Sequence, residues 1–450
     1  MNWQQLISDK RFGKEESHEA AGERRTEFQR DYDRLIFSAP FRRMQNKTQV
    51  FPLPGSIFVH NRLTHSLEVG CVGRSLGMDV AREIAVRHPG LQSTAPADMG
   101  AIVSAACLAH DMGNPPFGHS GERAIRSFFA EGKGCTLPHG GAAGPDVLGE
   151  VTWNDLTHFD GNANTFRLLT HQFAGRRRGG FVMTYSTLAA IVKYPFSSTL
   201  DGGKSKFGFF ECERAAYRRI ATELGIPLTE SAGGLRGVRH PLVYLVEAAD
   251  DICYEVMDFE DAHRLKILTT DEVIDAFLAF LPDERRARTE MIMRRVDDPN
   301  EQIAYLRSAV IGALTRCCAQ TFLDHEQEIL RGEMPGPLLR FIPERERTAY
   351  EHCNDISWRK IYCYSDVVDI EIAGNRIISF LLEKLLNAVL NPTLNYSRLL
   401  LAKFPGQYDT GAPTVYGKIQ AVLDHLSGMT DVYALDLYRK LNGTNLRIEN

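Results

Sequence analysis

The stretch AACLAHDMGNPPFGHSGE, residues 105–122, carries the strongest structural and chemical signal in this chain. Small and apolar residues at 105–109 are typical of a buried helix, and the Gly-Asn-Pro-Pro sequence at 113–116 forces that helix to end. His110 and Asp111 are therefore expected in its last turn. Burying an imidazole and a carboxylate there is costly unless a further group compensates the charge, and a metal ion would do so.

Two other helical segments carry residues of the same metal-ligating types. NRLTHS at residues 61–66 contains His65, and EAADD at residues 247–251 contains two adjacent aspartates. A His-Asp dipeptide alone is more often a surface pair or a hydrogen-bonded couple, so the prediction of a metal site depends on all three segments. Imidazole and carboxylate ligands suit Mn²⁺, Fe²⁺, Zn²⁺ or, with more water, Mg²⁺, and the residues do not select one of these ions.

The segment that follows His240-Pro241 is predicted to be a long helix with one acidic face. Asp250, Tyr254 and Asp258 recur at i, i+4 and i+8 and so line one side of it. The alternative, that these acids only complement a helix N-terminus, fits poorly because His240-Pro241 places the helix start well upstream. The helix therefore offers two carboxylates and a phenol to one site.

Helical spacing of apolar residues dominates the chain and predicts a mostly α fold. Strand-like alternation is limited to residues 49–53 and 180–184, so any sheet should be small. Glycine-rich stretches are expected to form loops, and they lie at residues 132–149, 175–180, 202–208 and 233–237.

Composition indicates a soluble, folded chain without a global signal for nucleic acid or membrane binding. Of 450 residues, 44% are apolar and 24% charged, and 52 basic residues stand against 57 acidic ones. Residues 1–10 lack the apolar core of a secretory signal, and the apolar stretch 376–390 is too short to span a bilayer. Nine cysteines without a CxxC pair argue against a disulfide framework. We therefore expect a cytoplasmic protein that does not bind membranes.

The motifs above belong to an ordered set of segments: FRRMQNKTQVFP (41–52), NRLTHSLE (61–68), HDMGNPPFGHSGE (110–122), THFDGNANTFR (157–167), EAADDICYEVMDFED (247–261) and SGMTDVYALDLYRKL (427–441). This set resembles the deoxyguanosine triphosphate triphosphohydrolase family of the HD superfamily. The resemblance covers the whole chain. It implies a single body of residues 1–450, with an HD-domain helical core at about 60–265 and a C-terminal helical region at about 266–450, additional helical lobes and small β-hairpin elements.

The resemblance implies four metal ligands, His65, His110, Asp111 and Asp250. Asp251 is the competitor for the fourth position, but only Asp250 has a tyrosine and a second aspartate in helical register, as in the family. The expected cofactor is a divalent metal ion, Mn²⁺ or Mg²⁺, with Fe²⁺, Co²⁺ and Zn²⁺ also open.

The resemblance also implies a proton donor for the leaving group. His119 is the candidate general acid and Glu122 the residue that orients it, although His119 could instead cap the following helix. His158 resembles a phosphate-contacting histidine of the family and is a further catalytic candidate.

The remaining site residues are expected to bind substrate. Arg62 lies one turn from His65 on the same helix, whereas Lys193 and Lys206, as lone lysines, would ordinarily be solvated and depend on the resemblance. Tyr254 and Asp258 are expected to contact the sugar, and Gln49 the sugar or base, with surface or turn roles as the alternative for the glutamine.

The function implied is metal-dependent hydrolysis of deoxynucleoside triphosphates, dGTP by default, to deoxynucleoside and tripolyphosphate by water attack at the α-phosphate. Two alternatives stay open: an HD phosphodiesterase or nucleotidase acting on monophosphates or cyclic nucleotides, and a nucleic-acid-binding regulatory HD protein without turnover. The resemblance also implies a homo-oligomer, with a hexamer as one form, and a nucleotide or single-stranded DNA as a potential effector.

Overall fold

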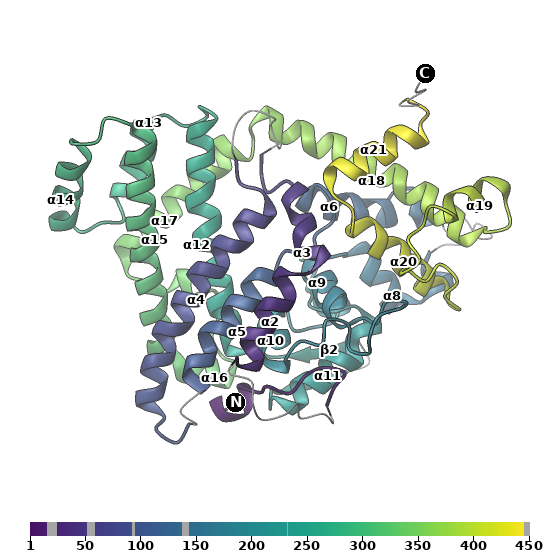
Figure 1. Cartoon of the computed structure of the whole chain (residues 1–450), viewed down its shortest axis with the longest axis horizontal. Helices are drawn as coiled ribbons and strands as arrows, with labels where there is room; N and C mark the ends of the chain where they lie inside the picture. Colours follow the sequence, from purple (N-terminus) through teal and green to yellow (C-terminus); the bar gives the residue numbers. More distant parts are fainter. Residues whose placement is uncertain (16–24, 52–58, 92–94, 137–143, 232, 445–450) are drawn as a thin grey trace.

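Three long helices form the centre of the molecule and carry the predicted metal ligands (Figure 1). They are α4 (Arg62–Arg87), α5 (Ala95–Ala109) and α12 (Pro241–Arg264), and each packs against the other two. The computed structural model describes residues 1–15, 25–51, 59–91, 95–136, 144–231 and 233–444, with only the backbone of residues 95–97.

Local sequence signals explain where these helices begin and end. The Asn61 side chain accepts hydrogen bonds from the backbone N–H groups of the first turn of α4, so it caps that helix. Helix α12 begins at Pro241, as the His240-Pro241 pair predicts. Helix α5 ends at Ala109, so the His110-Asp111 pair, which was predicted in the last helical turn, lies in the turn that directly follows.

Glycines allow α4 and α5 to approach one another closely. A Cβ atom added at Gly73 would lie 2.5 Å from Cys107 Sγ, and one added at Gly77 would lie 2.9 Å from the Gly100 Cα atom. The second contact is with backbone and cannot be relieved by a side-chain rotation. Close packing of these two helices therefore depends on the absence of side chains along this face of α4.

The first hydrophobic core surrounds the three central helices. Helices α2 (Glu27–Ile36) and α10 (Tyr185–Ile191) pack on α5, and α15 (Pro299–Asp324) packs on α4 and α12. The other helices on this side of the molecule are α1 (Trp3–Leu6), α3 (Ala39–Arg43), α9 (Gly161–Thr170), α11 (Arg214–Glu223), α13 (Thr270–Leu278), α14 (Asp283–Met293), α16 (Glu326–Arg331) and α17 (Glu344–Ile356).

A second hydrophobic core lies beside the first and joins distant parts of the sequence. In it α18 (Ser365–Leu390) packs against α6 (Gly118–Ala130) and α20 (Val415–Ser427), at the right of Figure 1. The other helices of this lobe are α7 (Gly144–Leu148), α8 (Glu150–Thr157), α19 (Asn395–Leu401) and α21 (Asp431–Leu441). The apolar stretch 376–390 is thus part of a helix that packs on one side into this core, with residues such as Leu381 and Leu385 buried.

The fold is mostly α, as predicted, with one small antiparallel hairpin of β1 (Leu228–Ser231) and β2 (Gly234–Gly237). The positions of the predicted strands are wrong in the described residues. Residues 49–51 form bends and 180–183 form a turn and coil, although residues 52–53 lie outside the described part of the chain. The predicted loop at 233–237 instead contains β2.

A carboxylate takes up one backbone donor beside the first of these stretches and one within the second. The backbone N–H of Thr48 donates to Asp431 Oδ2 at 2.7 Å, and that of Thr184 donates to Asp31 Oδ2 at 2.9 Å. Only isolated bridges form there, Thr48 with Asn61 and Arg11 with Thr184. Side-chain acceptors therefore take up donors that a strand would offer to a neighbouring strand.

No single helix in the described ranges combines the length and the apolar character needed to cross a membrane; α18 and α19 meet the criterion only as a pair, bent by 108°.

Replacing Gly77 by leucine is expected to lower the free energy of unfolding by about 1–3 kcal/mol, because the new side chain meets the backbone of α5. Gly90→Leu is the matched control, since a Cβ atom there has no neighbour within 4 Å; its effect should stay within about 0.5 kcal/mol. Urea unfolding followed by circular dichroism measures both. Equal unfolding midpoints for the two variants would contradict the close α4–α5 packing.

Candidate active site

The four predicted metal ligands converge at the centre of the molecule. His65 comes from the first turns of α4, Asp250 from the middle of α12, and His110 and Asp111 from the turn after α5. Asp250 Oδ1 lies 3.0 Å from His65 Nε2 and 3.4 Å from His110 Nε2, and Asp111 Oδ2 lies 3.7 Å from His110 Nε2. Ligand atoms of His65, His110 and Asp111 all lie within 4.8 Å of one another. The Asp250 contacts complete a set of two imidazoles and two carboxylates.

The chemistry of this donor set fits a divalent cation. His110 Nδ1 lies 2.6 Å from the carbonyl oxygen of Cys107, to which it can donate, and this leaves the Nε2 lone pair directed at the cluster. Burial alone would raise the pKa of the Asp250 carboxyl, but the His110 and His65 imidazoles hold it well below its ordinary value. Neutral imidazole and ionised carboxylate are the forms that bind Mn²⁺, Fe²⁺, Co²⁺ or Zn²⁺.

A cavity of about 300 Å³ opens beside this cluster. Nine of the predicted site residues line it: Gln49, Arg62, His110, Asp111, His119, Lys193, Lys206, Asp250 and Tyr254. The volume lies at the lower end of the range of small-molecule sites, and the walls combine a metal-type cluster with cationic side chains. The wall also contains Asp251, the competitor for the fourth ligand position, and Asn162, together with Asn114, Tyr194 and Glu247, to which the sequence prediction gave no role.

His119 stands at this cavity in contact with Glu122. Its Nδ1 lies 2.9 Å from Glu122 Oε2, and its side chain is 58% exposed whereas that of Glu122 is 1% exposed. The backbone N–H of Gly161 donates to the other Glu122 oxygen at 2.7 Å. Burial favours the protonated carboxyl, but His119, Lys206 and this N–H together lower the pKa of Glu122 well below its usual range. Glu122 is therefore a fixed anion that orients the imidazole.

The start of α6 lies directly over Arg62. Phe117 and Gly118 have positive φ angles of 63° and 56°, and a Cβ atom at Gly118 would lie 2.2 Å from an Arg62 guanidinium nitrogen. Only glycine allows the chain to pass over Arg62 so closely. Arg62 in turn donates to Asp111 Oδ2, so the guanidinium lies between the metal cluster and the His119 turn.

Both predicted lysines reach the cavity, and each already has an acidic neighbour. Lys193 Nζ lies 3.3 Å from Glu247 Oε1, and Lys206 Nζ lies 3.5 Å from Asp160 Oδ1. Their side chains are 24% and 29% exposed, so neither is an ordinary solvated surface lysine. Because these contacts are long, each ammonium group keeps donors for a bound anion.

Two polar atoms of the cavity wall lack partners. Gln49 Oε1 and Arg62 Nε are buried and have no hydrogen-bond partner among the described residues. An unpaired buried acceptor or donor is unfavourable in the protein alone. A ligand that offers a donor to Gln49 and an acceptor to Arg62 would satisfy both.

The predicted sugar-reading face of α12 forms around Tyr254. Its ring centroid lies 6.3 Å from that of His65 and 6.1 Å from that of Tyr362. Asp258 is 4% exposed and does not line the cavity; its Oδ2 accepts a hydrogen bond of 2.9 Å from the Tyr362 hydroxyl. Sequence reasoning missed Tyr362, and no local pattern marks a tyrosine that lies 104 residues from its partner.

His158 is not part of the cavity wall, and its Nε2 lies 3.8 Å from Asp201 Oδ2. Its Nδ1 lies 3.2 Å from the carbonyl oxygen of Asn154. Its catalytic role stays a prediction.

Comparisons with known proteins identify the family of this chain. The HD domain model matches residues 62–140, and the phosphohydrolase-associated domain model matches residues 341–440. The chain is 38% identical to a deoxyguanosinetriphosphate triphosphohydrolase-like protein of Synechocystis sp. over 99% of its own length and 100% of that relative. It is 37% identical to a like-named protein of Pseudomonas aeruginosa (98% and 99% covered) and 28% identical to the deoxyguanosinetriphosphate triphosphohydrolase of Serratia proteamaculans (92% and 93% covered). The chain therefore belongs to the deoxyguanosinetriphosphate triphosphohydrolase-like family of HD phosphohydrolases.

Proposed function

We propose that the protein hydrolyses deoxynucleoside triphosphates to a deoxynucleoside and tripolyphosphate. The observation that carries the proposal is the cluster of two imidazoles and two carboxylates, open to a cavity whose wall brings Arg62, Lys193, Lys206 and His119 together. In this reaction a water oxygen forms a bond to the α-phosphorus, and the bond from that phosphorus to the 5′ oxygen breaks. The names of the relatives make dGTP the first substrate to test.

His65, His110, Asp111 and Asp250 would hold the divalent cation. When bound there, such an ion supplies Lewis-acid polarisation of a phosphate oxygen and favours ionisation of the attacking water.

The cationic residues of the wall offset the charge of the polyphosphate. The Nε atom of Arg62 has no hydrogen-bond partner, and the ammonium groups of Lys193 and Lys206 have N–H donors that their acidic neighbours do not use. Such charge-assisted hydrogen bonds are short and strong, so the three side chains would also fix the triphosphate in one orientation. A nucleotidase acting on monophosphates would not need three cationic side chains for its substrate.

The leaving 5′ oxygen needs a proton, and His119 is placed to supply it. Its Nδ1 is engaged by Glu122, so in the imidazolium form Nε2 is the nitrogen free to donate toward the cavity. The buried Glu122 anion stabilises the charged ring before transfer. The proton goes to the 5′ oxygen, and the deoxynucleoside leaves as a neutral alcohol.

Tyr254, Asp258 and Gln49 would bind the nucleoside. Tyr254 presents its ring to the cavity, and Asp258 acts on the sugar side through the Tyr362 hydroxyl that it holds. Close packing of these rings where a 2′ hydroxyl would lie favours deoxyribose. The free Gln49 carbonyl would accept a donor from the sugar or base.

Incubation with dGTP and Mn²⁺ is expected to release deoxyguanosine and tripolyphosphate in equal amounts, as resolved by anion-exchange chromatography. His110→Ala should show no release, because it removes a ligand from the cluster. Pyrophosphate or orthophosphate as the inorganic product would overturn attack at the α-phosphorus. Absence of turnover with all four dNTPs, with mixed dNTPs or single-stranded DNA added, would favour the binding protein without turnover.

Asp250→Asn is expected to raise the Kd for Mn²⁺ by at least about 100-fold. Removing a residue that only hydrogen-bonds to a metal ligand typically weakens metal binding ~10–100-fold, and removing a ligand itself should weaken it more. Asp251→Asn is the matched control: its carboxylate lines the cavity and interacts with Lys193, and we expect less than a tenfold change, about 1.4 kcal/mol. Titration calorimetry with Mn²⁺ measures both. Equal losses would contradict the choice of Asp250.

His119→Ala is expected to lower kcat for dGTP by about 10²–10⁴-fold with little change in KM, because it removes a proton donor. His158→Ala is compared in the same steady-state assay; from its position outside the cavity wall we expect a smaller loss of kcat. A kcat unchanged in His119→Ala, or a larger loss in His158→Ala, would assign the proton donor to another residue.

A further inference from the structure

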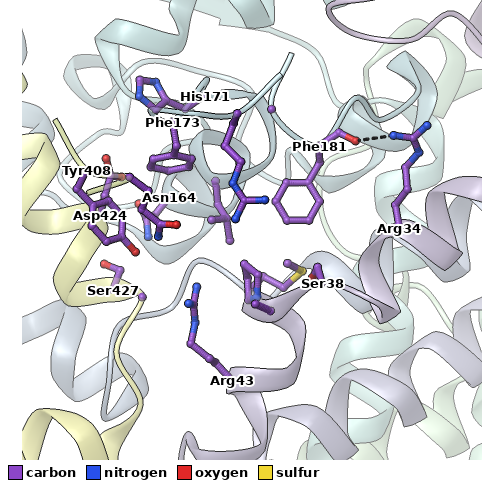
Figure 2. Close-up of a pocket in the computed structure, with 18 of the residues that line it drawn as sticks. Arg34, Ser38, Arg43, Asn164, His171, Phe173, Phe181, Tyr408, Asp424 and Ser427 are labelled. Carbon is purple, nitrogen blue, oxygen red and sulfur yellow. Dashed lines mark hydrogen bonds between the residues drawn. The ribbon is translucent and has the colours of Figure 1, made fainter. Parts of the chain in front are cut away.

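A second cavity, of about 390 Å³, lies behind the turn that carries Asp111. It shares no lining residue with the first cavity: Met112 of the turn lines the second cavity, whereas Asp111 lines the first. Asn164 and Ser427 lie in the wall of the second cavity (Figure 2). Because the turn borders a cavity on each side, close packing supports it only in part.

The wall of the second cavity contains several charged side chains. Within the described ranges, the side chains of Arg43 and Arg176 form no hydrogen bond or ion pair. The carboxylate of Asp424 is already bound by Nε and a terminal nitrogen of Arg167, at 2.8 Å each. Guanidinium groups without a partner retain their hydration, so they do not pack against the turn as apolar side chains would. The backbone of the turn must therefore be held by other contacts.

Two buried polar side chains hold this backbone. Lys47 Nζ donates to the carbonyl oxygen of Asn114 at 2.5 Å, and Asn164 Nδ2 donates to that of Gly113 at 2.6 Å. Lys47 is 2% exposed and Asn164 is 4% exposed. Breaking a buried hydrogen bond leaves its acceptor unsatisfied at a cost in free energy, so each of these bonds fixes the position of the backbone that it holds.

Helix α9 adds a third contact through the residue that follows Asn164. Thr165 Oγ1 accepts a hydrogen bond from the backbone N–H of Gly113 at 3.0 Å, and it lies 3.0 Å from the carbonyl oxygen of His110. A Cβ atom added at Gly113 would lie 2.1 Å from the backbone nitrogen of Thr165, so only glycine allows this approach. The turn therefore lies directly against the first half of α9.

The backbone that Lys47 holds carries a side chain that binds Asp111. Asn114 Nδ2 donates to Asp111 Oδ1 at 2.5 Å, and Arg62 donates to the other carboxylate oxygen. A displacement of residue 114 would move this donor and, with it, the carboxylate. Replacing a residue that orients a metal ligand typically weakens metal binding ~10–100-fold.

Lys47 also joins the turn to the C-terminal lobe. Its second acceptor is the carbonyl oxygen of Ser427, the last residue of α20, at 2.7 Å. Two N–H donors serve these two oxygens, so a neutral amine is sufficient for both bonds. Lys47 therefore holds the turn through its donors, and its positive charge is not required.

We propose that Lys47 and Asn164 are positioning residues of the metal centre, which hold the backbone of residues 113–114 and thereby keep Asp111 where it binds the cation. Neither side chain lines the first cavity, so neither would touch the metal or the substrate. Their role rests on the proposed metal site, and it does not depend on which nucleotide is hydrolysed.

Titration calorimetry with Mn²⁺ tests the role of Lys47. Lys47→Met keeps most of the length and the apolar stem of the side chain but removes both donors, and it should raise the Kd for Mn²⁺ ~10–100-fold. The direction of this change is decisive, because loss of a positive charge near a cation site would by itself lower the Kd. A Kd equal to or lower than that of the wild type would overturn the role of Lys47.

Asn164→Ala should raise the same Kd, and Leu169→Ala is its matched control on α9. The Leu169 side chain is buried, lines neither cavity and lies more than one turn from Asn164. Its removal should lower the melting temperature at least as much as Asn164→Ala does, because it leaves a cavity in the core, but it should not change the Kd. An equal rise in Kd in both variants would attribute the rise to lost stability and overturn the role of Asn164.

The visible absorption of bound Co²⁺ reports the arrangement of the ligands independently of affinity. At saturating Co²⁺, Lys47→Met and Asn164→Ala should shift the bands of the wild type, and Leu169→Ala should not. Wild-type bands in all three variants would overturn the proposal and leave the metal site in place. Absence of Mn²⁺ and Co²⁺ binding by the wild type would overturn the metal site itself, and the role of both positioning residues with it.

Discussion

The partly buried carboxylate of Asp250, which lies between two imidazoles, is the group on which the rest of the structure depends. An ionised carboxylate inside a helical core is tolerated only when opposite or hydrogen-bonding groups surround it, and here those groups are His65 of α4 and His110 of the turn after α5. Helices α4, α5 and α12 must therefore cross within a few ångström of one point. The bare glycine face of α4 allows this approach, because a side chain at Gly77 would push α5 away.

The turn between α5 and α6 extends that constraint to the C-terminal lobe. Asp431, at the start of α21, accepts hydrogen bonds from the backbone N–H groups of Thr48 and Phe117, at 2.7 and 2.9 Å. Lys47 Nζ donates to the carbonyl oxygens of Asn114 and Ser427, at 2.5 and 2.7 Å. Because burial lowers the pKa of Lys47 to about 7, it acts here mainly as a donor to neutral oxygens. The turn between α5 and α6 is thus held by Lys47 and by Asp431, which lies 314 positions from Phe117.

Local signals explain which parts of this arrangement the sequence could predict. The predicted metal ligands lie next to a helix cap or next to the Pro-Pro pair that ends a helix, and the acidic face of α12 is given by helical register. Both features can therefore be predicted from a few neighbouring residues. Tyr362 and Asp431 have no such signal, since each meets the site only through tertiary packing. The strand predicted at residues 180–184 failed for the same reason: the backbone donor of Thr184 goes to Asp31, a partner that no local alternation reveals.

Charge is distributed in opposite ways in the two cavities. In the first, Lys193 and Lys206 have acidic neighbours at 3.3 and 3.5 Å, so the cations stay stable without ligand and keep donors for an anion. In the second, Arg43 and Arg176 have no acidic partner within the described residues, and the carboxylate of Asp424 is neutralised by Arg167. The net charge of -5 indicates neither arrangement, because it sums the charges of the whole chain, whereas the charge in each cavity depends on a few local side chains. Of the two arginines, Arg43 is the half-buried one, so an anion beside it would compensate a charge that solvent stabilises only in part, whereas Lys193 and Lys206 already have that compensation.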